Sequence, residues 1–361
     1  MKCSIITIHH IHNFGSVYQA YCLYRFLEKN GYKTELVDYR PTYYDAGKKR
    51  IRTLAGKLLN FRAYSVRKRK FEKFIQSYDT LSPRRFTTFS ELEKYYENSE
   101  STFIAGGDQL WNNYHPCGND DAYKLAFVKK AKKLSYGTSM GRDDFNEEEL
   151  ISLAEKISGF DSVMLRERSG VEQLSRHISV DVSHVIDPVG LLDLEELRKI
   201  AKKPDIKKPY AVMYLADSGP ILDEAVKKLS DELGLKIVHI CGFKKKCYCD
   251  VFEKSAGPEE ILGYILNADF VLSASFHATM FSLLFNKPFA TILPGAKTNA
   301  RIEDILLYVG LQNRILNTVK DVDRIMDSID FVSVNKKLEV FRLKSQQKLL
   351  DALCALEKEQ E

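Results

Sequence analysis

The chain has 361 residues, 44% of them apolar and 29% charged, which is ordinary for a globular protein and long enough for two domains. This composition excludes disorder over the whole chain, and a net charge of only +5 argues against a protein built mainly to hold nucleic acid. The seven cysteines lack the spacing of a disulfide framework, which favours a reducing compartment. Without a run of roughly 18 to 20 apolar residues or a secretory signal, the expected location is the cytoplasm.

Short apolar strands alternate with helical segments in the first half of the chain. A helix is predicted over Val17–Asn30, with Ser16 as its cap and Gly31 at its end. Five strands are predicted, over Cys3–Ile8, Glu35–Tyr39, Thr102–Ala105, Lys133–Gly137 and Ser162–Leu165. This alternation is typical of a doubly wound α/β domain.

A basic segment interrupts this pattern at about residues 46–77, where a helical periodicity is predicted. Between Lys48 and Lys73 there are eleven Lys or Arg residues and one acid, Glu72. We interpret the segment as an insertion in the N-terminal domain. A solvated helical face explains its charge, and a peripheral contact with an anionic membrane is the alternative.

The second half repeats the alternation after a linker over 201–209, AKKPDIKKP, which has two prolines and four lysines. Four strands and three helices are predicted, namely Tyr210–Leu215, Lys236–Cys241, Phe270–Ser273 and Phe289–Leu293, and Ile221–Leu233, Pro258–Asn267 and Ala278–Phe285. We therefore predict two Rossmann-like domains, over 1–200 and 201–335. An amphipathic helix over 336–361 is expected to pack back across them.

Polar clusters follow four of the predicted strands, at the edge where open α/β sheets bind ligands. The first is HHIHNFGSVYQAY, residues 9–21, where a helix N-terminus favours an anion and a plain strand-to-helix turn explains the sequence equally well. Its candidate binding residues are Asn13, Gly15, Ser16 and Gln19. The three histidines lack a companion Cys or acid motif, and the C-x-C of Cys247 and Cys249 lacks a second pair, so no metal is expected.

The second cluster is AGGDQLWNN, residues 105–113, in which paired glycines leave a strand and present several polar side chains. Its candidate site residues are Gly106, Gly107, Asp108, Gln109, Trp111 and Asn112. Trp111 is the only tryptophan, and it suits a sugar-stacking platform and a core anchor equally well.

The third cluster consists of GTSMGR, residues 137–142, and RERSG, residues 166–170. Its candidate binding residues are Ser139, Arg142 and Arg166. The guanidinium groups of the two arginines are suited to recognising carboxylates and phosphates. Each arginine alone can equally be an ordinary surface residue. Together they point to an anionic substrate.

The fourth cluster is SASFHATMFSLLFNKPFATI, residues 273–292. Ser275 and His277 stand between an apolar strand and an apolar helix. At a helix N-terminus an imidazole stays able to exchange a proton at physiological pH, so we predict that His277 has a catalytic role.

These clusters, in order, resemble the polysaccharide pyruvyl transferase family from Met1 to about Arg314. The motifs that carry the resemblance are HNFGSVYQAY, LVDYRP, FIAGGDQLWN, YGTSMG, LRERSG, DPVGLLD, DFVLSASFHATMFSLLFNKPF and NARIEDILLYVGL. The resemblance implies two facing Rossmann-like domains, similar to GT-B glycosyltransferases. It also implies transfer of the enolpyruvyl carbons of phosphoenolpyruvate onto two sugar hydroxyls as a cyclic ketal, with no metal and no further cofactor.

The resemblance also implies roles for single residues. Arg166 matches a donor-binding arginine, and His277 matches a general acid for the enol double bond. Where the family has an arginine two residues before this histidine, the chain has Ser275, so either Arg301 or Lys297 replaces it or the donor differs. Asp108 or another carboxylate is expected to deprotonate the sugar hydroxyl.

The acceptor is expected to be a glycan or a lipid-linked oligosaccharide of a cell-surface polysaccharide, met at the inner face of the cell membrane. Two alternatives stay open. One is a GT-B-like glycosyltransferase with a nucleotide-sugar donor, and the other is a non-catalytic protein of the same fold.

Overall fold

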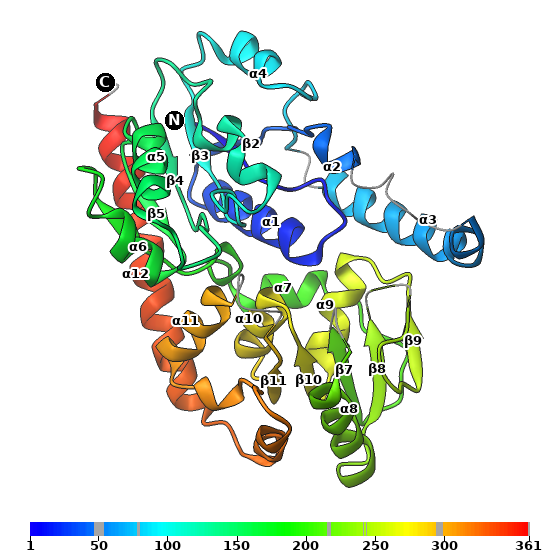
Figure 1. Ribbon diagram of the computed structural model, residues 1–361. Coiled ribbons are helices and arrows are strands. Elements are labelled where there is room, and N and C mark those ends of the chain that lie inside the picture. The colour runs from blue at the N-terminus through cyan, green and yellow to red at the C-terminus, as the bar shows by residue number, and fades with distance from the viewer. Residues whose placement is uncertain are drawn as a thin grey trace. The chain divides into compact units, whose positions relative to one another are not determined.

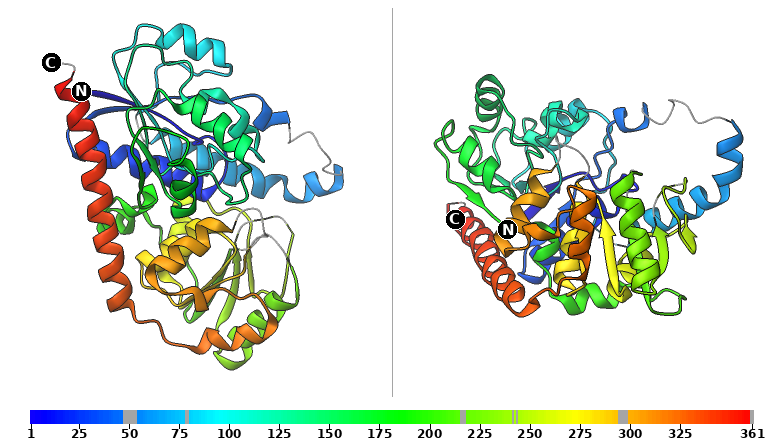
Figure 2. Two further views of the ribbon diagram at one scale, coloured as in Figure 1. Left: turned by 60° about the vertical axis from the view of Figure 1, so that its left-hand side comes forward. Right: turned by 60° about the horizontal axis from the view of Figure 1, so that its bottom comes forward.

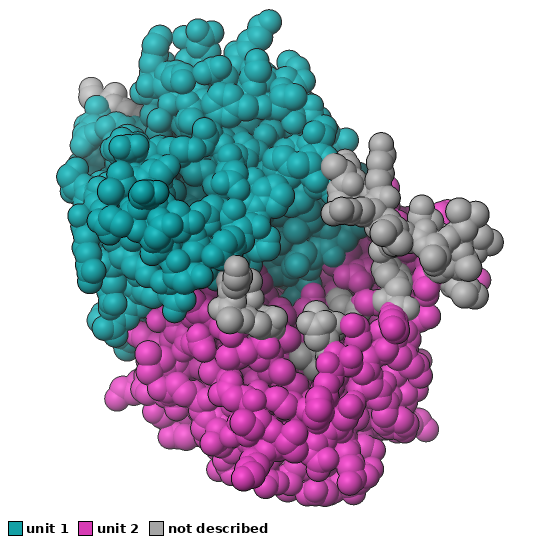
Figure 3. Space-filling view, in the orientation of Figure 1, with its two compact units in different colours: residues 1–52, 75–192, 339–361 teal, residues 53–74, 193–338 magenta. Residues whose placement is uncertain are grey.

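A computed structural model describes residues 1–46, 54–77, 80–214, 218–240, 242, 244–293 and 299–359. The chain divides into two compact units (Figure 3). Unit 1 comprises residues 1–52, 75–192 and 339–361, and unit 2 comprises residues 53–74 and 193–338. Each unit contains a parallel sheet with helices packed on it, as the sequence predicts (Figure 1). Among the described residues no helix combines the length and the apolar character needed to cross a membrane.

The sheet of unit 1 has the strand order β2-β1-β3-β4. Its strands are β1 (Lys2–Ile6), β2 (Lys33–Leu36), β3 (Thr102–Ala105) and β4 (Lys133–Ser135), all paired in parallel. Two short strands, β5 (Val163–Leu165) and β6 (Val182–His184), continue it through the bridges Leu134↔Ser162 and Thr138↔Leu165. Since the chain leaves β1 for β2 on one side and joins β3 on the other, the topological switch point lies between β1 and β3.

Helices cover both faces of this sheet. The helices of unit 1 include α1 (Phe14–Lys29), α2 (Tyr43–Ala46), α4 (Phe89–Tyr96), α5 (Glu147–Ile157) and α6 (Arg168–Leu174). Side chains of α4 and α5 form one hydrophobic core with Ile6 and Phe103. Because side chains alternate along a strand, Ile5 faces the other side of the sheet. There Ile5 and Leu23 of α1 both lie within 3.5 Å of the position that a Cβ on Gly106 would occupy.

The sheet of unit 2 has the strand order β11-β10-β7-β8-β9. Its strands are β7 (Tyr210–Tyr214), β8 (Lys236–Ile240), β9 (Val251–Glu253), β10 (Phe270–Ser273) and β11 (Phe289–Thr291), all paired in parallel. Here the switch point lies between β7 and β10. The helices on this sheet include α7 (Leu194–Ile200), α8 (Pro220–Lys227), α9 (Pro258–Asn267), α10 (Phe276–Leu284) and α11 (Ala300–Val309).

The boundary between the units falls at 192/193, before the predicted boundary at 200/201. Helix α7 belongs to unit 2, because it packs on α9 and because Lys202 directly after it pairs with Glu259 at 2.5 Å. The segment 201–209 therefore lies inside unit 2.

The basic helix α3 (Leu54–Gln76) corrects a second prediction, since residues 54–74 of it belong to unit 2 and not to the N-terminal domain. Two contacts hold it there. Lys70 pairs with Glu260 of α9 at 3.1 Å, and Lys254 donates to Oδ1 of Asn60 at 3.0 Å. The beginning of the basic segment, residues 47–53, lies outside the described residues.

The C-terminal helix α12 (Phe331–Lys358) is one continuous helix (Figure 2). Its residues from 339 onward belong to unit 1. Ser345 accepts a hydrogen bond from the backbone N–H of Ile186 at 2.8 Å, and the N-terminal amine of Met1 pairs with Glu357 at 3.0 Å. This part of the helix is thus a component of unit 1, beside the first strand.

Candidate active site

The N-terminus of α1 lies at the switch point of unit 1 and holds Asp108. The helix begins three residues before the predicted start, because Asn13 and not Ser16 is its cap: Oδ1 of Asn13 accepts from the N–H groups of Gly15 at 2.9 Å and Ser16 at 3.3 Å. The hydroxyl of Ser16 is thereby left to donate to Oδ2 of Asp108 at 2.5 Å. The N–H of Gln109 donates to the other carboxylate oxygen at 2.8 Å.

Asp108 follows β3 in a left-handed conformation, with φ of 77°. Its side chain is largely buried, at 9% exposure, but it is not sealed off. A non-glycine residue in this conformation is uncommon and is found preferentially at functional sites. Two donors therefore fix a partly accessible carboxylate at the edge where the fold binds ligands.

Buried hydrogen bonds hold the loop that carries Asp108 in place. The amide of Gln19 donates to Thr7 Oγ1 at 2.9 Å and to the carbonyl of Ser16 at 2.9 Å, and Thr7 donates to the carbonyl of Gly107 at 2.8 Å. A Cβ on Gly107 would lie 2.8 Å from Gln19 Oε1 and 2.9 Å from Pro188 Cγ. Gln19 and Gly107, predicted to bind substrate, thus pack against protein and position the loop.

Gly106 has the same supporting role, since its added Cβ would lie 3.0 Å from the Cβ of Thr7. The amide of Asn112 donates to Gln109 Oε1 at 2.8 Å, and Asn112 is completely buried. These two amide side chains stabilise the loop from Asp108 onward. Asn112 is therefore not presented to a ligand as the sequence interpretation expects, while Gln109 is half-buried.

Trp111 is a core residue, which corrects its assignment to the substrate-binding set. Its side chain is 1% exposed, its indole N–H donates to the carbonyl of Tyr123 at 3.0 Å, and its ring meets Phe160 edge-on at 5.8 Å. With its faces buried, the ring offers no stacking platform for a sugar.

Arg166, predicted to grip an anionic donor, is instead held between two carboxylates of its own unit. Its Nη1 donates to Oδ2 of Asp187 at 2.5 Å and its Nε lies 3.5 Å from Glu167, with all three side chains almost completely buried. Burial opposes the charge of Arg166, but Asp187, Glu167 and Asp108 outweigh it and raise its pKa. Ser139 is also drawn into this network, donating to Glu167.

Arg142 likewise has its charge matched within unit 1. It pairs with Asp144 at 2.8 Å and Glu149 at 2.6 Å, and its guanidinium lies 4.2 Å from the Tyr114 ring and 3.8 Å from the Phe145 ring. Burial lowers its pKa, but the hydrogen bonds to Glu149 and Asp144 dominate and raise it. The contacts of Arg142 therefore stabilise the loop before α5.

In unit 2, Ser275 and His277 lie after β10, at the switch point with β7. Helix α10 begins before the predicted Ala278, because Ser275 is its cap and accepts from the N–H of Ala278 at 3.4 Å. His277 is in the first turn, 5% exposed, with its ring edge-on to Phe276 at 5.2 Å. Arg301, in the first turn of α11, lies 5.6 Å from the same Phe276 ring.

The sequence interpretation thus finds both switch points but misses three residues that support the one in unit 1. Thr7, Glu167 and Asp187 all follow strands and contact predicted residues, so the strand ends were the signal that could have revealed them. Asp108 and His277 belong to different units. Lys297, a proposed replacement for the family arginine, lies outside the described residues.

His9, the first of the three clustered histidines, is part of a buried ion cluster. Its two ring nitrogens lie 3.1 Å from Asp38 Oδ1 and 3.1 Å from the carbonyl of Thr7. Asp38 also pairs with Arg40 at 2.5 Å and Arg85 at 3.1 Å. In the part of the chain that the structure describes, no group of His, Cys, Asp and Glu is placed to hold a metal ion.

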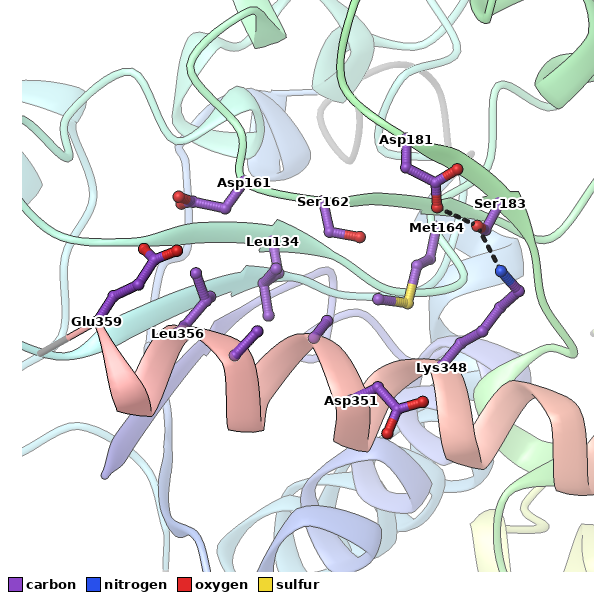
Figure 4. Close-up of a pocket in the computed structure, with 12 residues that line it drawn as sticks. Leu134, Asp161, Ser162, Met164, Asp181, Ser183, Lys348, Asp351, Leu356 and Glu359 are labelled. Carbon is purple, nitrogen blue, oxygen red and sulfur yellow. Dashed lines mark hydrogen bonds between the residues drawn. The ribbon is translucent and has the colours of Figure 1, made fainter.

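A pocket of about 400 Å³ lies against the last turns of α12, at the end of the unit 1 strands opposite to Asp108 (Figure 4). Asp161 and Asp181, which precede β5 and β6, line it together with Lys348, whose Nζ donates to Ser183 at 2.9 Å. Ser183 in turn donates to Asp181 at 2.6 Å, so one serine bridges the lysine and this carboxylate. Because it opens at the amino ends of the strands, it is separate from the candidate site.

The sequence over residues 13–294 matches the polysaccharide pyruvyl transferase family. A search of curated proteins finds no match.

Three solved structures are similar over nearly their whole length. They are a putative UDP-N-acetylglucosamine 2-epimerase from Listeria monocytogenes (10% identity, TM-score 0.61, 99% of this chain and 97% of that one), a UDP-GlcNAc 2-epimerase from Methanocaldococcus jannaschii (13%, 0.54, 98% and 100%) and a glycosyltransferase from Rickettsia africae (10%, 0.51, 99% and 98%).

At these identities the similarity shows the fold alone, which is the GT-B type with two Rossmann-like domains. The family match covers well over half of the chain and includes the loops of Ser16, Asp108 and His277. The chain therefore belongs to the polysaccharide pyruvyl transferase family.

Proposed function

We propose that the protein transfers the pyruvyl group of phosphoenolpyruvate to a sugar of a cell-surface polysaccharide precursor and forms a cyclic ketal. The observation that carries the proposal is the placement of one proton-transfer group at the switch point of each unit, Asp108 after β3 and His277 after β10. In open α/β sheets these are the positions where ligands bind.

In the proposed reaction, His277 donates a proton to C3 of the donor while a first sugar hydroxyl attacks C2 and loses its proton to Asp108. Phosphate then leaves from C2 with the electrons of its C–O bond. A second hydroxyl of the same sugar attacks C2 and releases a proton, which closes the ketal. The net products are the ketal and inorganic phosphate. Of the two hydroxyl protons, one makes up for the proton that His277 gives to C3 and the other is taken up by the leaving phosphate.

The contacts of Asp108 support its role as the base. Ser16 Oγ at 2.5 Å and the Gln109 N–H at 2.8 Å orient the carboxylate, in a residue that is 9% exposed. A base must be held within hydrogen-bond reach of the proton it removes, which requires this kind of fixed carboxylate.

Among the arginines that the sequence suggests for donor recognition, Arg301 suits the role better than Arg166 or Arg142. Arg166 and Arg142 are each paired with two carboxylates, whereas Arg301 lies over the Phe276 ring next to His277. We therefore assign the donor carboxylate or phosphate to Arg301, which takes the place of the arginine that Ser275 lacks. The acceptor in this proposal is a glycan or a lipid-linked oligosaccharide.

A coupled assay tests the proposal. Purified protein is given phosphoenolpyruvate and a panel of pNP and lipid-linked sugars, and both phosphate release and acid-labile pyruvate on the sugar are measured. We expect His277→Gln to lower turnover by about 10² to 10⁴-fold, the range for a general acid, with the donor still bound. The matched control His115→Gln changes an exposed histidine and should keep full turnover.

The second candidate is a glycosyltransferase that uses a nucleotide-sugar. It is favoured by Ser275, whose side chain caps α10 and cannot pair with an anion as an arginine does. Thermal shift separates the two functions: stabilisation by phosphoenolpyruvate alone supports pyruvyl transfer, and stabilisation by UDP or a UDP-sugar alone overturns it.

A further inference from the structure

The basic helix α3 presents its charge on the side opposite its buried aromatic residues. Phe71 and Phe74 are buried, while Arg62, Arg69 and Lys73 are exposed. The exposed residues are spaced by seven and four positions, so they form one stripe along the helix. The helix thus buries its apolar side and presents the basic stripe to solvent.

Little opposes the charge of this stripe. Glu72 is the one acid between Lys48 and Lys73, and it lies 3.5 Å from Lys68, on the same helix. Phe61, next to Arg62, is 68% exposed. An exposed aromatic ring beside several uncompensated cations is typical of a surface that meets the headgroups of an anionic bilayer.

Contacts place helix α3 near a second basic element, the loop after β8. Lys254, which bonds to Asn60 of α3, lies 5.0 Å from the Phe252 ring, and Phe252 stacks on His239 at 5.0 Å. Burial, followed by the charges of Lys246 and Lys245, lowers the pKa of His239.

Lys244 and Lys245 are exposed, so the loop adds further positive charge at the sheet edge where Lys254 meets α3. Both the loop and Lys254 follow the carboxyl ends of their strands, β8 and β9. Asn60 lies on the other side of α3 from the stripe, so the stripe and the loop flank this helix. We call the three exposed residues of the stripe and Lys244 and Lys245 of the loop the basic surface.

We propose that the basic surface docks unit 2 on an anionic phospholipid bilayer. The partner is chosen by charge complementarity, because four to eight Lys or Arg on an amphipathic helix and its neighbours are typical of binding to anionic lipid. The inference rests on the proposed function, because a lipid-linked acceptor for that reaction would be presented at a bilayer.

Vesicle flotation of the full chain tests this proposal. Wild type should float with vesicles of phosphatidylglycerol and phosphatidylcholine and should not float with phosphatidylcholine alone. Replacing Arg62, Arg69 and Lys73 together with Gln should weaken the apparent affinity by about a hundredfold, because each cation near such a surface contributes about a fivefold step. Raising the salt from about 0.1 to about 1 M should release the wild type.

A matched control removes three exposed lysines of the same unit, Lys199, Lys203 and Lys207, which lie near the amino edge of the sheet. Gln has nearly the helix propensity of Lys and Arg, so neither variant should lose much helix stability. The control should float like wild type. A second variant, Lys244→Gln with Lys245→Gln, measures the loop alone and should show a smaller loss.

Three results would overturn the proposal: wild type fails to float, it floats equally with neutral vesicles, or the control loses as much affinity as the stripe variant. Retention of a short RNA without vesicle binding would instead make the surface a nucleic-acid site. Failure here is distinguishable from failure of the proposed function, because turnover of phosphoenolpyruvate with a water-soluble acceptor should be equal in wild type and the stripe variant.

Discussion

Arg166 Nη1 donates to Asp187 Oδ2 at 2.5 Å, and both side chains are almost completely buried. This pair connects the ends of β5 and β6, two three-residue strands that have little backbone pairing of their own. The LRERSG and DPVGLLD motifs thus have a structural role, since each contributes one charge to a buried ion pair.

Replacing Arg166 with Gln should destabilise unit 1 by about 3 to 5 kcal/mol, because Asp187 and Glu167 would be left as uncompensated buried charges. Urea unfolding measures the loss. Arg168→Gln is the matched control, since Arg168 is exposed and pairs with Glu172 on the helix surface, and it should cost less than about 0.5 kcal/mol. A stable Arg166→Gln protein with a raised KM for phosphoenolpyruvate would restore the donor-binding role.

The contact between Ser16 and Asp108 predicts a graded effect on turnover. Asp108→Asn removes the base and should lower kcat by about 10² to 10⁴-fold. Ser16→Ala removes one hydrogen bond to a charged group, worth about 1.5 kcal/mol, and should lower kcat by roughly tenfold.

Asp143→Asn is the control for this pair, since Asp143 is an exposed acid of the same unit, and it should leave kcat unchanged. If Ser16→Ala changed stability but not kcat, the serine would hold the loop without serving the carboxylate.

The position of Trp111 predicts a stability effect without a binding effect. Trp111→Phe leaves the carbonyl of Tyr123 without its buried donor and removes part of a packed ring, so the free energy of unfolding should fall by roughly 1 to 3 kcal/mol. The KM for acceptor sugars should stay unchanged. A raised KM with unchanged stability would contradict the core assignment.

The sequence predicts the fold well where the signal is local. Strands Thr102–Ala105 and Phe270–Ser273 and helix Pro258–Asn267 have the predicted bounds, because apolar runs end there at polar or turn residues. β6 and β9 were missed, since each has three residues and no completely buried apolar run. The unit that α3 joins was also missed, because it depends on Lys70 meeting Glu260, far away in the sequence.

In the candidate site, too, the sequence predicts local features and misses those that depend on distant contacts. That Asp108 and His277 follow strands can be read from the sequence, but whether a side chain faces a ligand depends on partners elsewhere. Arg166 looks like a free cation in LRERSG until Asp187, 21 residues later, is placed beside it. Gly107 looks like a ligand-facing glycine until Pro188 is found 2.9 Å from its missing Cβ.

The cluster around Asp38 predicts how stability changes with pH. Burial alone would raise the pKa of Asp38, but hydrogen bonds from His9 and Arg40 outweigh it and hold this pKa well below its ordinary value. The folded state therefore binds this proton less readily than the unfolded state does. The resulting stabilisation is complete above the unfolded pKa of about 3.9 and is lost as the pH falls through the lowered folded pKa.

Asp38→Asn should therefore lower the free energy of unfolding most at neutral pH, and its deficit relative to wild type should shrink as the pH falls below about 4. Urea unfolding at a series of pH values from about 6 to about 3 measures this convergence. Asp143→Asn, which changes an exposed carboxyl, should run parallel to wild type over the same range. A deficit of Asp38→Asn that stayed constant with pH would mean that the cluster stabilises unit 1 through packing, and not through the charge that His9, Arg40 and Arg85 surround.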